Sequence, residues 1–118
     1  MPWLTLKNRR QFDLVYSHGL KRVAPALVLF HLREASDQQV AYVASRKVGG
    51  AVQRNRAKRL MRVAFRQLAD AQPMPHGWFV LIARSEILGL GSGAVQEQLH
   101  ELLANPDSTP GGDGARDT

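Results

Sequence analysis

The chain of 118 residues contains no cysteine. Disulfide bonds and thiolate metal sites are therefore excluded, which is typical of a protein from a reducing cytoplasm. No apolar run is long enough to cross a bilayer, since the longest, such as Val23 to His31, are short and interrupted. The N-terminus lacks the apolar core and the small-residue cleavage site of a signal peptide. We expect a cytoplasmic protein with no membrane partner, built as one small domain.

The sequence also lacks a group of side chains that would catalyse a reaction. Its four histidines are scattered, and none pairs with another histidine or a carboxylate at metal-ligand spacing. The ten carboxylates are scattered as well, and no glycine-rich loop precedes a Lys-Ser or Lys-Thr pair as in a P-loop. A nuclease that uses its own residues is therefore disfavoured, and we expect no catalytic residue and no metal site on the protein.

Acidic residues are missing from one segment in particular, Ser45 to Arg66. This segment holds eight of the sixteen Lys and Arg residues, whereas the rest of the chain sets eight bases against all ten acids. The net charge of +6 is therefore concentrated in one place. So dense a cluster repels itself unless an anion lies against it, and nucleic acid is the usual counter-charge.

Hydrophobic periodicity predicts three helices. The first runs from about Asn8 to Ser17, with Asn8 as a candidate N-cap. The strongest signal runs from about Ala51 to Ala71, where one apolar stripe at helical spacing consists of Ala57, Leu60, Met61, Ala64, Phe65 and Leu68. The last helix follows Ser92, a candidate N-cap, and its predicted buried face consists of Val95, Leu99, Leu102 and Leu103.

Three segments are typical of strands, namely Ala26 to Leu32, Gln39 to Ala44 and Trp78 to Arg84. The polar loop from Arg33 to Gln38 predicts that the first two form a hairpin. A strand, a helix and another strand after a hairpin indicate a single sheet covered by helices, which is an α+β or two-layer architecture. From about Ala104 the chain lacks core-forming residues, so a disordered tail is predicted.

The lysine and arginine residues of the central helix are of the kind that binds RNA. Lysine and arginine contact phosphates, and the planar guanidinium allows bidentate contacts. Asn55 both donates and accepts hydrogen bonds, which suits a base edge or a 2′-hydroxyl. The alternative is an ordinary solvated helix face, but such a face normally carries glutamates at i, i+4, and none occurs here.

The segment Val48 to Arg66, preceded by Ser45-Arg46-Lys47, resembles the signature of the bacterial ribonuclease P protein component. That signature is a Ser-basic-Lys-Val-Gly stretch followed by Arg-Asn-Arg, Lys-Arg and Phe-Arg on one helix. Val63 stands where the family commonly has an acid or Gln, and Arg46 replaces a frequent Lys. The similarity covers about Leu6 to Leu103, because the first helix and the last strand also match at Leu6, Lys7, Phe12, Val15, Tyr16, His18, Gly19 and the run from Val80 to Arg84.

The resemblance implies an α/β sandwich with the order α-β-β-β-α-β-α and a single mixed sheet, the ribosomal protein S5 domain 2-like fold. It also implies a left-handed crossover through the basic helix, where general rules favour the right-handed form. The order contains one strand more than the pattern predicts, and we expect it around Gln39 to Arg46. The domain would span residues 1–103, and residues 104–118 would form the tail.

The same resemblance implies that this protein is the subunit of an endoribonuclease whose catalyst is a large RNA. That RNA uses Mg²⁺ to remove the 5′ leader from precursor tRNA, and the protein is expected as a monomer in a 1:1 complex with it. Contacts to ribonuclease P RNA are implied for Arg46, Lys47, Arg54, Asn55, Arg56, Lys58, Arg59, Arg62 and Arg66.

The single-stranded 5′ leader is implied to lie between the first helix and the sheet, on Phe12, Tyr16 and Phe30. Aromatic stacking beside basic groups is how proteins hold single-stranded RNA. The surrounding charge would come from Lys7, Arg9, Arg10 and Arg84. From spacing alone, Phe12 and Tyr16 fit a core role better, since they lie one helical turn apart.

A second hypothesis is an RNA-binding protein without enzymatic role, such as a ribosomal protein, which the same basic helix would serve. The Arg-Asn-Arg signature combined with an aromatic pair on the first helix favours the ribonuclease P protein. The chain also ends in an acidic tail, where ribosomal proteins commonly carry basic extensions.

Overall fold

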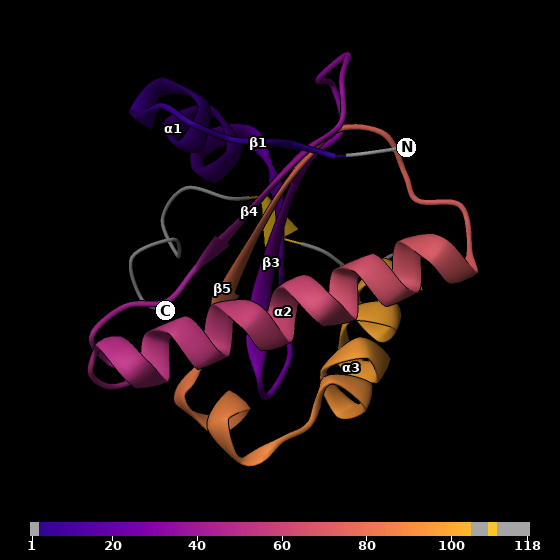
Figure 1. The fold of residues 1–118 in the computed structure, drawn as a ribbon. Helices are drawn as coiled ribbons and strands as arrows, with labels where there is room; N and C mark the ends of the chain where they lie inside the picture. The colour runs from indigo at the N-terminus through magenta and orange to yellow at the C-terminus, as the bar shows by residue number, and fades with distance from the viewer. Residues whose placement is uncertain (1–2, 105–108, 111–118) are drawn as a thin grey trace.

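A computed structural model of the chain describes residues 3–104 and 109–110. The elements follow one another as β1 (Leu4–Thr5), α1 (Arg9–His18), β2 (Leu20–Val23), β3 (Leu27–Leu32), β4 (Gln39–Val43), α2 (Ala51–Ala71), β5 (Trp78–Ala83), a 3₁₀ helix η1 (Ser85–Gly89), α3 (Ser92–Ala104) and β6 (Thr109–Pro110) (Figure 1). Without the two-residue strands and η1, this is the expected order α-β-β-β-α-β-α. The α+β class with a single mixed sheet is confirmed.

The strands form one sheet in the order β1-β4-β5-β3-β2-β6. The predicted hairpin between β3 and β4 is wrong, because β5 lies between them, antiparallel to β3 and parallel to β4. β3 is instead paired with β2 on one side and β5 on the other, and all six of its residues are buried, as expected for an interior strand covered on both faces. The crossover through α2 therefore joins the adjacent parallel strands β4 and β5, and its predicted left hand stays a prediction.

The strand that the pattern missed is β2, not a segment within residues 39–46. Its register pairs Lys21 with Phe30 and Arg22 with Leu29, which makes β2–β3 the hairpin of the fold. Lys21 and Arg22 interrupt the apolar pattern of this segment, so hydrophobicity alone does not predict a strand there. Charged side chains of this kind are frequent on strands near a sheet edge. The Arg22 Nη1 donates to the Leu102 carbonyl oxygen at 2.6 Å and so links this strand to α3.

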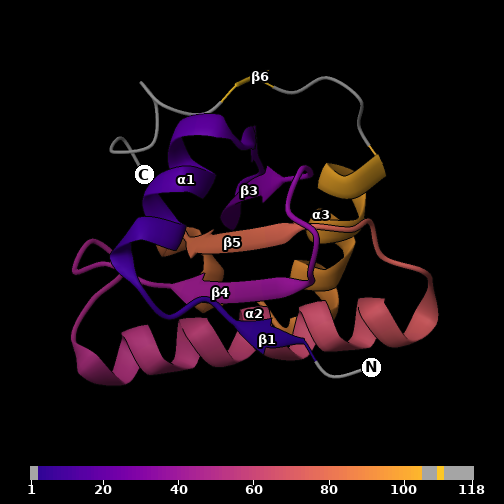
Figure 2. The same cartoon turned by 90° about the horizontal axis from the view of Figure 1, so that it is seen from above.

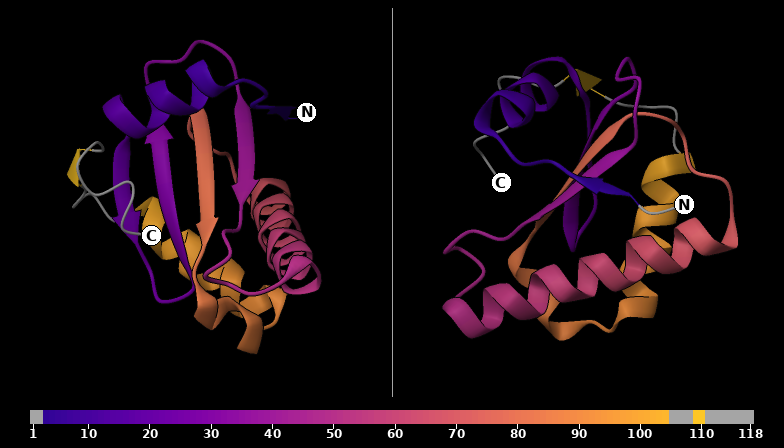
Figure 3. Two further views of the ribbon diagram at one scale, coloured as in Figure 1. Left: turned by 90° about the vertical axis from the view of Figure 1, so that its left-hand side faces the viewer. Right: turned by 45° about the horizontal axis from the view of Figure 1, so that its top comes forward.

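Strand alternation divides the interior into two cores. Leu27, Leu29 and Phe79 face α2 and α3, whereas Phe30 and Val80 face α1. Figure 3 (left) shows α1 crossing one face near one end of the strands, with α2 and α3 on the other side, and Figure 2 shows the same layers from above. Helices on both faces explain why the strand sequences are continuously apolar.

The helices begin and end close to the predicted positions. Asn8 is the N-cap of α1, where its side chain accepts from the Gln11 backbone N–H and the Gln11 side chain accepts from the Asn8 N–H. The bounds of α2 agree with the prediction, and its stripe is buried at five positions, with Leu60 partly buried. Ser92 is the first residue of α3 rather than its N-cap.

Asp37 joins the starts of β4 and β5. Its carboxylate accepts from the Trp78 Nε1 and from the Gln39 Nε2, both at 2.7 Å. These two hydrogen bonds, with Trp78 the larger contribution, hold the pKa of Asp37 below its ordinary value. Because Gln39 and Trp78 are register partners, the contact fixes the alignment of the parallel pair.

The predicted tail falls mostly on residues 105–108 and 111–118, which lie outside the described residues. Ala104 ends α3, and Thr109 and Pro110 pair antiparallel with β2. Within the part of the chain that the structure describes, no helix combines the length and apolarity that a membrane span requires.

We predict that Gly77→Ala destabilises the protein by about 1–3 kcal/mol in equilibrium urea unfolding. Gly77 precedes β5 with φ of +119°, and an added Cβ would meet the backbone carbonyl oxygen of Leu32. The matched control is Gly91→Ala, where a Cβ meets no atom within 4 Å. Equal effects in the two variants would show that this connection tolerates a side chain.

Candidate nucleic-acid interface

The helix α2 presents two opposite surfaces. At 100° per residue its apolar stripe points at the sheet, and the basic residues occupy the outer face and both flanks, one toward β4 and one toward α3. Figure 1 shows α2 running across the full width of the molecule, so this outer face is open along its length. The geometry thus presents the bases to a long anionic partner.

The structure brings the predicted RNA-binding residues onto one continuous stretch. Arg46 and Lys47 lie exposed in the turn before α2, and Arg54 and Lys58 are half-buried on the helix. The remaining members are exposed on α2, and they are Asn55, Arg56, Arg59, Arg62 and Arg66. Gly50 caps α2 without a side-chain hydrogen bond, so the first turn also presents backbone N–H groups.

Four of these bases follow one another at i, i+4 spacing, and we call them the basic row: Arg54, Lys58, Arg62 and Arg66. Within residues 3–104 and 109–110, the one salt bridge joins Arg9 Nε to Asp13 Oδ2 at 3.9 Å. The row therefore contains three like-charge pairs without a carboxylate partner, each unfavourable by about 0.2–0.5 kcal/mol. An approaching phosphate would relieve this repulsion.

A hollow of about 570 Å³ lies between α2 and the start of α3. It brings Asn55, Arg56 and Arg59 together with Val52, whose exposed fraction is 77%. The apolar side chain beside three polar ones was missed in the sequence, because Val52 belongs to neither the stripe nor the charge pattern. The arrangement offers phosphate contacts next to an apolar surface.

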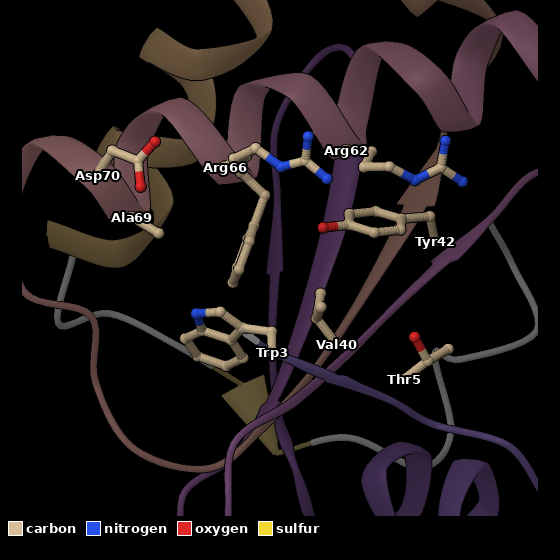
Figure 4. Close-up of a pocket in the computed structure, with 9 residues that line it drawn as sticks. Trp3, Thr5, Val40, Tyr42, Arg62, Arg66, Ala69 and Asp70 are labelled. Carbon is tan, nitrogen blue, oxygen red and sulfur yellow. The ribbon is translucent and has the colours of Figure 1, made fainter. Parts of the chain in front are cut away.

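A second hollow, of about 410 Å³, lies on the other flank of α2, between the helix and strands β1 and β4 (Figure 4). Its residues are Trp3, Thr5, Val40, Tyr42, Arg62, Phe65, Arg66, Ala69 and Asp70. The guanidinium carbon of Arg62 lies 5.6 Å from the centroid of the Tyr42 ring, a cation–π distance. Burial raises the pKa of Tyr42 to about 12 against the opposing effect of Arg62 and Arg66, so its hydroxyl is a neutral donor at physiological pH.

The aromatic residues predicted on the opposite face lie together but are not equivalent. The rings of Phe12 and Tyr16 are half-buried with centroids 6.1 Å apart. Phe30 has an exposed fraction of 0%, and Tyr16 packs edge-on against it at 5.0 Å. The prediction that Phe30 contacts a nucleotide directly is wrong for this structure, because the ring is covered by α1; it supports Tyr16 instead.

Burial raises the pKa of the Tyr16 hydroxyl, and the charge of Asp13 adds to the effect. Around this cluster Lys7, Arg9 and Arg10 are exposed. Arg84 lies elsewhere, at the end of β5, where its Nη1 donates to the Ala24 carbonyl oxygen at 3.1 Å. Among the residues described by the structure, no group of three or more His, Cys, Asp or Glu could hold a metal ion.

We predict that Lys58→Gln stabilises the protein at low ionic strength, since it removes two like-charge pairs of the basic row. The expected gain is about 0.4–1 kcal/mol, measured by urea unfolding at about 0.01 M salt, and it should shrink at about 0.1 M, where the Debye length falls to about 10 Å. Lys47→Gln is the control, because it removes the same charge from the turn outside the row. A gain independent of salt would contradict repulsion as the cause.

Known proteins that are similar to this chain belong to one family. A family model described as Ribonuclease P matches residues 3–107. The chain is 39% identical over 99 residues to the ribonuclease P protein component of a Nitratiruptor species, covering 84% of this chain and 88% of the relative. A second relative, from Coprothermobacter proteolyticus, is 32% identical over 100 residues, covering 85% and 82%.

Solved structures show the same fold. The ribonuclease P protein from Thermotoga maritima superposes with a TM-score of 0.71 at 28% identity, covering 84% of this chain and 94% of that chain. The Staphylococcus aureus RNase P protein gives a TM-score of 0.72 at 22% identity, covering 87% and 94%, which supports the fold alone. From the matched family model and the relatives above 30% identity, the chain belongs to the ribonuclease P protein family.

Proposed function

We propose that this protein is the RNA-binding subunit of a bacterial ribonuclease P, and that it holds the catalytic RNA against α2. The observation that carries the proposal is the basic row, fixed to the sheet by the stripe beneath it and without carboxylate partners within the described residues. A surface of this kind gains most from a partner with closely spaced phosphates. The exposed Arg59 and Arg56 beside the row extend the contact to the hollow near α3.

We assign the chemistry to the RNA partner and the Mg²⁺ ions to that RNA. The local excess of positive charge on α2 supports this, because a cationic surface repels a divalent cation but neutralises phosphates next to one. The protein would then act by bringing the RNA and its substrate together. The substrate is the precursor tRNA, and the product is tRNA with a mature 5′ end.

The test is reconstitution with a bacterial ribonuclease P RNA at low Mg²⁺. The protein should restore accurate cleavage of precursor tRNA at the 5′ end of the mature sequence, and Arg59→Gln should require more protein for the same rate. The control is Arg33→Gln, which removes one exposed charge from the loop after β3. No stimulation by protein shown to be folded would sink the proposal.

We further propose that the 5′ leader of precursor tRNA lies against α1, on Phe12 and Tyr16. Both rings are half-buried, so each is fixed by packing and still offers surface to a base. Stacking of one base on an aromatic ring contributes about 1–3 kcal/mol. Lys7, Arg9 and Arg10 around α1 would meet the leader phosphates.

We predict that Tyr16→Ala weakens binding of leader-bearing precursor by about 5- to 150-fold, the equivalent of one stacked base. Binding of mature tRNA, which has no leader, should change little. Leu14→Ala is the matched control, because Leu14 is 39% exposed on the same helix but outside the aromatic cluster. Equal losses for precursor and mature tRNA would assign Tyr16 a purely structural role.

A further inference from the structure

The hollow beside Tyr42 combines fixed aromatic walls with charged side chains. Trp3 packs edge-to-face against Phe65, with centroids 4.9 Å apart, and against Phe79 at 5.5 Å, yet it remains half-buried. Tyr42 packs on Phe65 from a second direction at 6.3 Å. In Figure 4, the Tyr42 hydroxyl and the Trp3 indole line opposite parts of the same space. The aromatic lining is thus positioned before any ligand arrives.

The charged side chains that line the hollow lie at two separate ends of it. Arg66 and Asp70 lie one helical turn apart, a spacing at which a salt bridge normally forms, but they form none in the described part of the chain. Figure 4 shows the Arg66 guanidinium turned toward the Tyr42 side and the Asp70 carboxylate at the far end. The hollow therefore has a cationic end, with Arg62 and Arg66, and an acceptor end.

This combination fits one kind of ligand best. An aromatic wall stacks a base, two guanidinium groups bind a phosphate, and an ionised carboxylate accepts hydrogen bonds only from donors such as an exocyclic amino group. The volume of about 410 Å³ falls within the range of about 300–1,000 Å³ of small-ligand sites. An inorganic anion would leave the aromatic wall and Asp70 unused.

We propose that this hollow receives one unpaired nucleotide of the RNA partner, with its base against Trp3, its phosphate on Arg62 and Arg66, and an exocyclic amino group on Asp70. The inference rests on the proposed function, since the nucleotide belongs to the RNA bound along α2. This hollow is a different site from the one formed by Phe12 and Tyr16 on α1, because the two lie on opposite faces of the sheet. Adenine, cytosine and guanine carry the amino group, and uracil does not.

The first test observes the two indole N–H signals of the full chain by NMR during titration with nucleotides. Trp3 lies in the hollow, whereas Trp78 packs in the other core and donates to Asp37, so it is an internal control. Adenosine 5′-monophosphate should shift the Trp3 signal alone, uridine 5′-monophosphate should shift it less, and inorganic phosphate least. Equal responses to all three, or none, would overturn the proposal.

The second test asks whether RNA binding becomes tighter or weaker when a negative charge is removed from the hollow. Asp70→Ala removes a negative charge beside the basic row, so a purely electrostatic surface would bind RNA more tightly. A hydrogen bond from a base to Asp70 predicts the opposite, a loss of about tenfold or more in affinity for ribonuclease P RNA. Asp70 is exposed on α2, so we expect the substitution to leave the fold intact, which the unfolding curve of the variant checks. Unchanged or tighter binding would contradict the nucleotide site.

Arg59→Gln separates this inference from the proposed function. Arg59 is exposed on α2 and does not line the hollow beside Tyr42. Its loss should weaken RNA binding and lower the slope of log K against log salt by about one, as for one phosphate contact. If wild-type protein binds no RNA, the proposed function fails; if Arg59→Gln behaves as expected and Asp70→Ala does not, only the nucleotide site fails.

Discussion

Burial of one stripe of α2 holds together a surface that repels itself. Met61, Phe65 and Leu68 are almost fully buried, and each large apolar side chain contributes about 1.5–3 kcal/mol. The three like-charge pairs of the basic row oppose this by about 0.2–0.5 kcal/mol each. Burial therefore exceeds repulsion several-fold, and the charges stay available for an RNA partner instead of being neutralised within the protein.

The sheet also separates two groups of aromatic residues from each other. Because β3 and β5 are buried on both faces, one layer of strands divides two aromatic groups. Phe12 and Tyr16 lie with α1 on one side, and Trp3 and Tyr42 lie with α2 on the other. Under the proposed function, a single small domain would contact two segments of RNA at once, one along the basic helix and one across α1, without competition between them.

The local features of the fold were predictable. The bounds of α2, its buried stripe and the Asn8 cap depend on residues at most a few turns apart, and the sequence pattern contains them. Pairings between distant strands were not. The loop at residues 33–38 suggested a hairpin of β3 with β4, but β5 arrives after α2 and inserts between them. Phe30 was likewise predicted on a binding surface, whereas the fold packs Tyr16 over it.

The sequence by itself determined that one basic helix with an apolar stripe dominates the chain, and its motif indicated the family, because periodicity and charge are properties of neighbouring residues. Tertiary structure alone decided which lysine and arginine side chains share a surface with which aromatic rings. Trp3, Tyr42 and Asp70 come from the flank of β1, from β4 and from α2, far apart in the chain, and only strand order brings them to one hollow. The physical reason is that contacts between distant segments follow from packing the whole core, which no local pattern encodes.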